Sequence, residues 1–96
     1  MTNILVVDDE KDIADLIEIY LDDYKVHKFY SSTKVLDYLK EQKIDLAILD
    51  VMMPEMNGYD LCKEIRKKYN FPIIFLTAKI DENDKLKGFS LAQMIT

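Results

Sequence analysis

The sequence is short of the residues that build linkers, cross-links and zinc sites. It has only two glycines, two prolines, one cysteine and one histidine in 96 residues. Cys62 has no partner for a disulfide within the chain, and one cysteine with one histidine cannot hold zinc. Any bound metal is therefore expected to be a hard cation held by carboxylates. With no repeat or low-complexity segment either, residues 1–96 are predicted to form one domain.

Positive charge and long apolar runs are scarce as well. Thirteen basic residues stand against eighteen acidic ones, which gives a formal net charge of -5. Such a chain repels a phosphate backbone, so we expect no direct contact with nucleic acid. No apolar run is long enough to cross a bilayer, and acidic residues follow Met1 too soon for a signal peptide. We therefore expect a cytoplasmic protein without a membrane partner.

Apolar residues are plentiful, at 49%, and they are grouped in short runs that alternate with helical patterns. Strands are predicted at Ile4–Val7, Lys25–Tyr30, Leu46–Leu49 and Ile73–Leu76. Apolar residues at the three-and-four spacing predict helices over residues 13–21, 35–39 and 61–69, and a fourth near Asp81 or Asn83. This alternation predicts an α/β fold, a doubly wound parallel sheet that binds ligands beyond the carboxyl ends of its strands.

Acidic residues stand where two of these strands end. Asp8 and Asp9 follow the first strand, and Asp50 follows the third. If the two strands are neighbours, the three carboxylates meet at one edge of the sheet, where mutual repulsion raises their proton affinity unless a cation neutralises them. Mg²⁺ is usually held by one or two carboxylates together with water and phosphate. The sequence therefore predicts a magnesium site. The competing interpretation, three solvated carboxylates at loop starts, does not explain their matching positions.

The segment around Asp50 indicates a nucleophile. Asp50 is followed by a turn that Pro54 and Gly58 constrain. A carboxylate beside a bound cation at a strand end is suited to attack phosphorus and form an acyl phosphate. Thr77, at the end of the fourth strand, is placed to donate its hydroxyl to a phosphoryl oxygen, although a threonine there is more often only a β-branched strand residue.

Three segments resemble a known family. Residues 6–10 (VVDDE), 46–58 (LAILDVMMPEMNG) and 73–78 (IIFLTA) together resemble the receiver domain of two-component response regulators, closest to the subfamily with a winged-helix DNA-binding domain. The resemblance runs from Ile4 to about Leu91. It implies a flavodoxin-like fold and a role in phosphorelay signalling and the regulation of transcription.

The resemblance also implies roles for individual residues. Asp50 would accept a phosphoryl group from a sensor histidine kinase. Asp9, Asp50 and the backbone carbonyl of Met52 would hold Mg²⁺, with Asp8 in support, and Thr77 would be the switch hydroxyl. In this interpretation the protein is a signalling phosphoacceptor, an enzyme only in catalysing its own phosphorylation and dephosphorylation.

The C-terminal part departs from the family pattern. Receiver domains continue into a fifth strand that ends in Lys-Pro and then a fifth helix, whereas this chain stops at Thr96 and has no Lys-Pro. We therefore expect a C-terminally truncated receiver that lacks most or all of the fifth strand and the fifth helix, and no DNA-binding domain within residues 1–96. The fourth strand would then form a sheet edge with unpaired backbone groups, which predicts homo-oligomers through that edge.

Three other functions deserve comparison. A truncated receiver that binds partners without switching is the main alternative, because the Lys-Pro lysine is missing. A phosphatase of the haloacid dehalogenase type would carry a second aspartate two residues after Asp50, where Met52 stands. A flavodoxin-like electron carrier would need hydroxyls and backbone amides after the first strand, where this chain has acids.

Overall fold

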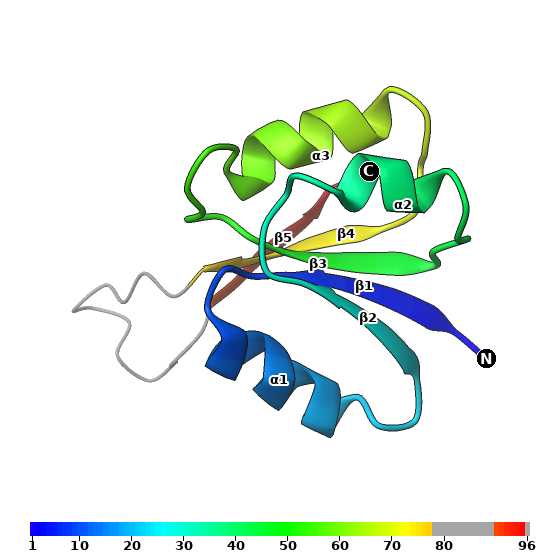
Figure 1. Ribbon diagram of the computed structural model, residues 1–96, viewed down its shortest axis with the longest axis vertical. Helices are drawn as coiled ribbons and strands as arrows, with labels where there is room; N and C mark the ends of the chain where they lie inside the picture. The colour runs from blue at the N-terminus through cyan, green and yellow to red at the C-terminus, as the bar shows by residue number, and fades with distance from the viewer. Residues whose placement is uncertain (78–89, 96) are drawn as a thin grey trace.

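The computed structural model describes residues 1–77 and the backbone of residues 90–95. Five strands and three helices lie in this part of the chain (Figure 1). In chain order they are β1 (Asn3–Val7), α1 (Lys11–Tyr20), β2 (Lys25–Phe29), α2 (Val35–Leu39), β3 (Leu46–Asp50), α3 (Gly58–Arg66), β4 (Ile73–Thr77) and β5 (Ser90–Ile95).

The strands form one sheet in the order β2-β1-β3-β4-β5. The first four are mutually parallel, and the register pairs Val6 of β1 with Ile48 of β3, which in turn faces Ile74 of β4. The predicted doubly wound parallel sheet is confirmed. Because β1 and β3 are direct neighbours, their carboxyl ends lie side by side at one edge.

The fifth strand corrects one expectation. β5 runs antiparallel to β4, from the pair Thr77 and Ser90 to the pair Ile73 and Ile95. The prediction that β4 is an unpaired edge open to a second copy is therefore wrong, because its backbone groups bond to β5 of the same chain (Figure 1). An antiparallel strand needs no helical crossover, so a short return of the chain is enough to supply it. The predicted helix near Asp81 or Asn83 lies outside the described residues.

Side chains alternate between the two faces of the sheet, and each face has its own core. On β1, Leu5 and Val7 pack with α2 and α3, whereas Ile4 and Val6 pack with Ala14 of α1. All five side chains are buried. Figure 1 shows the same layering, with α1 on one face and with α2 and α3 on the other. Of the helices in the described ranges, none is long and apolar enough to cross a membrane.

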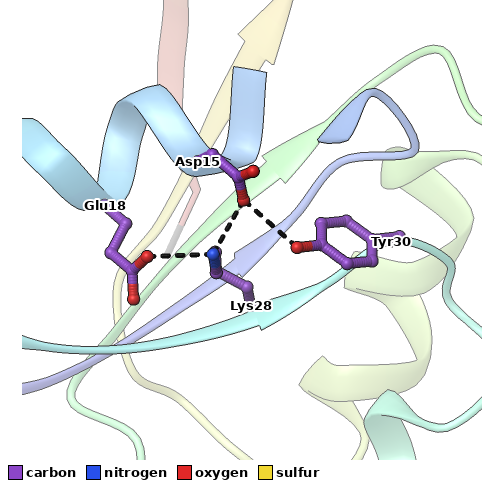
Figure 2. A network of polar contacts seen from close by, with 4 residues as sticks. All are labelled: Asp15, Glu18, Lys28 and Tyr30. Atoms are coloured by element: carbon purple, nitrogen blue, oxygen red, sulfur yellow. Dashed lines mark hydrogen bonds and ion pairs between the residues drawn. The ribbon is translucent and has the colours of Figure 1, made fainter. Parts of the chain in front are cut away.

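An ionic network attaches α1 to β2 (Figure 2). The ammonium group of Lys28 lies 2.7 Å from Asp15 Oδ1 and 2.9 Å from Glu18 Oε1, and the Tyr30 hydroxyl donates to Asp15 Oδ1 at 3.1 Å. The hydrogen bond to Asp15, followed by that to Glu18, raises the pKa of Lys28. Because the acidic partners are half exposed, we attribute to this network the orientation of α1 rather than a large stabilisation.

A buried histidine connects β2 to its neighbours. His27 Nδ1 bonds to the Tyr38 hydroxyl of α2, and Nε2 lies 3.0 Å from Asn3 Oδ1 of β1. Burial lowers the pKa of His27. The neutral ring with its proton on Nε2 donates to Asn3 and accepts from Tyr38, so both nitrogens are satisfied without a charge. His27 is therefore part of the packing between α2 and the sheet.

Shortening a buried isoleucine should cost more than the same change on the surface. Ile65 of α3 is fully buried, whereas the side chain of Ile19 on α1 is 67% exposed. We expect Ile65→Val to lower the free energy of unfolding by about 0.5–1.5 kcal/mol, because it removes a packed methylene. The matched change Ile19→Val should cost less than about 0.5 kcal/mol. Urea unfolding curves measure both, and equal losses would contradict the packing of α3 on the sheet.

Candidate functional site

Three carboxylates meet at the carboxyl edge of the sheet. Asp8 and Asp9 follow β1 directly, and Asp50 is the last residue of β3. One oxygen from each lies within 4.8 Å of the others. The predicted convergence of these three residues, hereafter the acidic cluster, is confirmed. Its cause is the parallel pairing of β1 with β3, which places both strand ends at the same level.

Backbone amides orient the two buried carboxylates of the cluster. Asp8 Oδ1 accepts the N–H of Glu10 at 2.9 Å, and Asp50 Oδ1 accepts the N–H of Met52 at 3.1 Å. Each bond closes a tight turn in which the carboxylate binds the backbone two residues further on. The side chains are thereby fixed as the chain leaves each strand, and one oxygen of each carboxylate stays available to the cluster.

The electrostatics of the cluster favour a proton or a cation. Asp8 is 3% and Asp50 7% exposed, whereas Asp9 is exposed. Burial, followed by the charge of Asp8, raises the pKa of Asp50 to about 7. Burial also raises the pKa of Asp8. Without a metal, the two buried carboxylates therefore retain a proton near neutral pH. A divalent cation would replace that proton, because it neutralises the same repulsion.

The start of α3 is pressed against the backbone of Asp50. A Cβ atom on Gly58 would lie 2.3 Å from the carbonyl oxygen of Asp50, and the Gly58 N–H donates to the carbonyl of Val51 at 3.1 Å. The sequence predicted that Gly58 constrains the turn after Asp50. Gly58 does not adopt a positive φ, and its role is to permit this close approach. The left-handed conformation in the loop belongs to Glu55, with a φ of 71°.

Two further predicted site residues lie nearby, and their roles stay predictions. Met52 follows Asp50 by two residues, and its side chain is 64% exposed beside the cluster. Thr77 ends β4, the strand next to β3, and its backbone pairs with Ser90 of β5. The side chain of Thr77 lies outside the described residues. The sequence predicted that mutual repulsion raises the proton affinity of the carboxylates, but it could not show that burial is the larger cause of the raised pKa of Asp50, because only the folded chain provides that burial.

Comparisons with known proteins point to one family. The family model described as "Response regulator receiver domain" matches residues 4–94. Regulatory protein VanRc of Enterococcus gallinarum and regulatory protein VanR of Enterococcus faecium are each 47% identical over 90 residues. The match covers 92% of this chain and 39% of each relative. The chain thus spans about two fifths of the length of these curated relatives.

Solved structures show the same fold. The response regulator TrrA of Thermotoga maritima, in complex with Mg²⁺-BeF, has a TM-score of 0.76 and 38% identity, covering 82% of this chain and 71% of that one. The chemotaxis protein CheY4 of Vibrio cholerae has a TM-score of 0.78 and 28% identity, covering 90% of this chain and 76% of that one.

The raised pKa of Asp50 predicts how stability depends on pH. A carboxyl group whose pKa rises from 3.8 to about 7 on folding stabilises the fold in acid, and this contribution is lost as the pH rises from about 4 to 7. In the absence of Mg²⁺, Asp50→Asn should therefore raise the free energy of unfolding at pH 8 by about 1–3 kcal/mol and much less at pH 4.5. Urea unfolding at both pH values, in EDTA, measures the difference.

A matched control separates the cluster from general charge effects. Asp22 is an exposed aspartate after α1, and Asp22→Asn should leave the pH profile of the wild type unchanged. Saturating Mg²⁺ should remove the difference in free energy of unfolding between Asp50→Asn and the wild type at pH 8. Parallel pH profiles for wild type and Asp50→Asn would show that Asp50 does not retain the proton.

Proposed function

The chain belongs to the response regulator receiver domain family, and from this premise we propose that Asp50 takes a phosphoryl group from a sensor histidine kinase with the help of Mg²⁺. The observation that carries the proposal is the convergence of Asp8, Asp9 and Asp50 within 4.8 Å. A receiver domain is a signalling module of two-component systems.

The donor set of the acidic cluster suits Mg²⁺. All three side chains offer hard oxygen ligands, and Asp9 is exposed, so one side of the cluster stays open to water and phosphate. We assign Asp9, Asp50 and the backbone carbonyl of Met52 as ligands, with Asp8 supporting them from its buried position. The bound cation supplies charge neutralisation for the incoming phosphoryl oxygens. The relative TrrA carries Mg²⁺-BeF in its solved structure, which supports the assignment by similarity.

The transfer itself is a displacement at phosphorus. A deprotonated oxygen of Asp50 attacks, the new O–P bond forms as the bond from phosphorus to the donor nitrogen breaks, and the product is an acyl phosphate. Because the pKa of Asp50 is about 7, its proton must leave before the attack. The chain's own carboxylates position the reacting groups, so the domain catalyses its phosphorylation. Dephosphorylation is a separate hydrolysis, in which water attacks the phosphorus, the O–P bond to Asp50 breaks, and inorganic phosphate leaves the restored carboxylate. Thr77 is proposed to donate its hydroxyl to a phosphoryl oxygen.

We further propose that the domain is the receiver part of a longer protein that regulates transcription. The relatives VanRc and VanR are regulatory proteins of greater length, and the winged-helix subfamily is inferred from similarity to them. A cytoplasmic setting follows from that role. The net charge of -5 disfavours nucleic acid contact by this domain itself.

One observation favours a second function, a receiver that binds partners without switching. The strand next to β4 is the antiparallel β5, in the place where the family has a parallel strand ending in Lys-Pro. β5 itself carries no lysine, so in this alternative that strand supplies no cationic partner to a phosphoryl group on Asp50. Under this alternative, phosphorylation occurs but leaves the backbone around Thr77 unchanged. Amide NMR spectra of residues 73–77 before and after phosphorylation distinguish the two functions.

The nucleophile is tested by intact mass. With acetyl phosphate and Mg²⁺, we expect the wild-type chain to gain the mass of one phosphoryl group. Asp50→Asn should gain none, because an amide cannot form the acyl phosphate. The control variant Asp22→Asn should react like the wild type. An adduct on Asp50→Asn would assign the nucleophile to another residue.

The metal ligands are tested by affinity. Removing a charged ligand in Asp9→Ala should weaken Mg²⁺ binding about tenfold, since the buried pair then holds the ion without its exposed partner. The control Asp12→Ala removes an exposed aspartate of α1 and should leave the affinity within about twofold. Amide shifts followed during a Mg²⁺ titration give both dissociation constants. Equal affinities for the two variants would exclude Asp9 as a ligand.

A further inference from the structure

A cavity of about 670 Å³ lies at the edge of the sheet opposite the acidic cluster. It is open to the surface and is lined by the connections that lead into β3 and β4, residues 39–45 and 68–72. Because the strands are parallel, these connections lie at the amino ends of β3 and β4 and the cluster lies at the carboxyl end of β3. The volume is in the range of small-molecule sites, and none of the three cluster aspartates lines it.

The inner wall of the cavity is apolar and aromatic. Leu39 and Ile44 are each 5% exposed and belong to the larger core. The rings of Tyr69 and Phe71 lie 5.9 Å apart at an angle of 36°, and both side chains are half-buried. Such a wall offers van der Waals contact to a flat apolar group.

Three lysines line the cavity around this wall, and two of them make no ion pair within the described residues. Lys43 and Lys68 are exposed and line the cavity, and within the described ranges no carboxylate lies within ion-pair distance of either. Lys40 also lines the cavity but pairs with Asp37 at 3.7 Å. The free ammonium groups therefore belong to Lys43 and Lys68, one from each connection.

The carboxylates of the lining cancel the charge of its lysines only in part. Asp45 Oδ2 accepts the backbone N–H of Asn3 at 2.8 Å, which ties that carboxylate to the start of β1 but leaves its charge in place. Together with Glu41, the lining holds two acids against Lys40, Lys43 and Lys68. The formal charge of the lining is therefore +1, in a chain whose net charge is -5. A basic site in an acidic chain favours an anion at this position over the rest of the surface.

We propose that this cavity binds a small anion joined to a flat apolar body, such as an aryl carboxylate or an aryl phosphate. Its ring packs against Tyr69 and Phe71, and its anionic group lies between the ammonium groups of Lys43 and Lys68. This site is separate from the acidic cluster, so the proposal does not depend on the phosphoacceptor function.

The surroundings favour a small molecule over an acidic peptide. A second cavity of about 290 Å³ adjoins the first between α2 and α3 and shares Lys40, Lys68 and Tyr69 with it. A peptide that extended beyond the first cavity would enter the second, where Asp37 and Glu64 form part of the lining. There Asp37 pairs with Lys40 and Glu64 pairs with Lys67, so within the described residues the second cavity offers an extending acidic chain no unpaired ammonium group besides that of Lys68, which the compact anion already uses.

The test is a titration with 2-naphthoate and with 1-naphthyl phosphate, without Mg²⁺, followed by amide shifts of the full chain. We expect saturable shifts confined to residues 39–45 and 68–72. Lys43→Gln and Lys68→Gln should each weaken binding about fivefold, as expected for the loss of one ionic contact. The matched control Lys63→Gln, an exposed lysine of α3 outside the cavity, should bind like the wild type. The uncharged 2-naphthalenemethanol and inorganic phosphate should each bind more weakly than 2-naphthoate and 1-naphthyl phosphate, which combine a ring with an anionic group.

Several outcomes would overturn the proposal. One is amide shifts centred outside residues 39–45 and 68–72. Another is an affinity for the naphthyl anions that is the same in Lys43→Gln, Lys68→Gln and Lys63→Gln. A third is an affinity of the wild type for 2-naphthalenemethanol that equals its affinity for 2-naphthoate. Tighter binding of an acidic aromatic peptide, with shifts over α2 and α3, would assign the site to a protein partner. Thermal unfolding of each variant shows that it is folded. Acetyl phosphate labelling of the same variants reports on Asp50 separately, so failure at one site is distinguished from failure at the other.

Discussion

The repulsion among Asp8, Asp9 and Asp50 is the constraint that the rest of the structure has to satisfy. Two of these carboxylates are buried, and the pKa of Asp50 rises to about 7 because burial and the charge of Asp8 disfavour its ionised form. Such a site lowers the stability of the metal-free chain at neutral pH, so the fold must hold it by other means. The two cores of the sheet, with Leu5 and Val7 on one face and Ile4 and Val6 on the other, provide that stabilisation.

Rigidity around Asp50 comes from backbone contacts rather than from side-chain bulk. The Asp50 carboxylate accepts the N–H of Met52, and α3 begins so close to the Asp50 carbonyl that only glycine fits at position 58. Asp50, the proposed nucleophile, is thereby held at a strand end with its turn fixed from both sides. Preorganisation of this kind suits a reaction in which the domain supplies position and charge and little covalent chemistry of its own.

Parallel strands also separate the charges of the molecule into two sites. The carboxyl ends of β1 and β3 present the acidic cluster, whereas the connections before β3 and β4 present Lys43 and Lys68 around an aromatic wall. The Lys28 network with Asp15 and Glu18 lies apart from both and attaches α1 to β2. The proposed cation site and the proposed anion site lie at opposite ends of a small sheet and share no lining residue, so each can be tested without the other.

The sequence by itself determined the alternation of strands and helices, the two-sided core and the presence of acids at the ends of two strands, which the pairing of β1 with β3 then brings together. Each is set by short-range patterns, because runs such as residues 46–50 carry both the strand signal and the acid at its end. Only the tertiary structure decided the antiparallel pairing of β5 with β4, the contact of Gly58 with Asp50 and the cavity between two connections. These features join segments distant in the chain, and register, packing and burial are fixed by the assembled fold rather than by any local window.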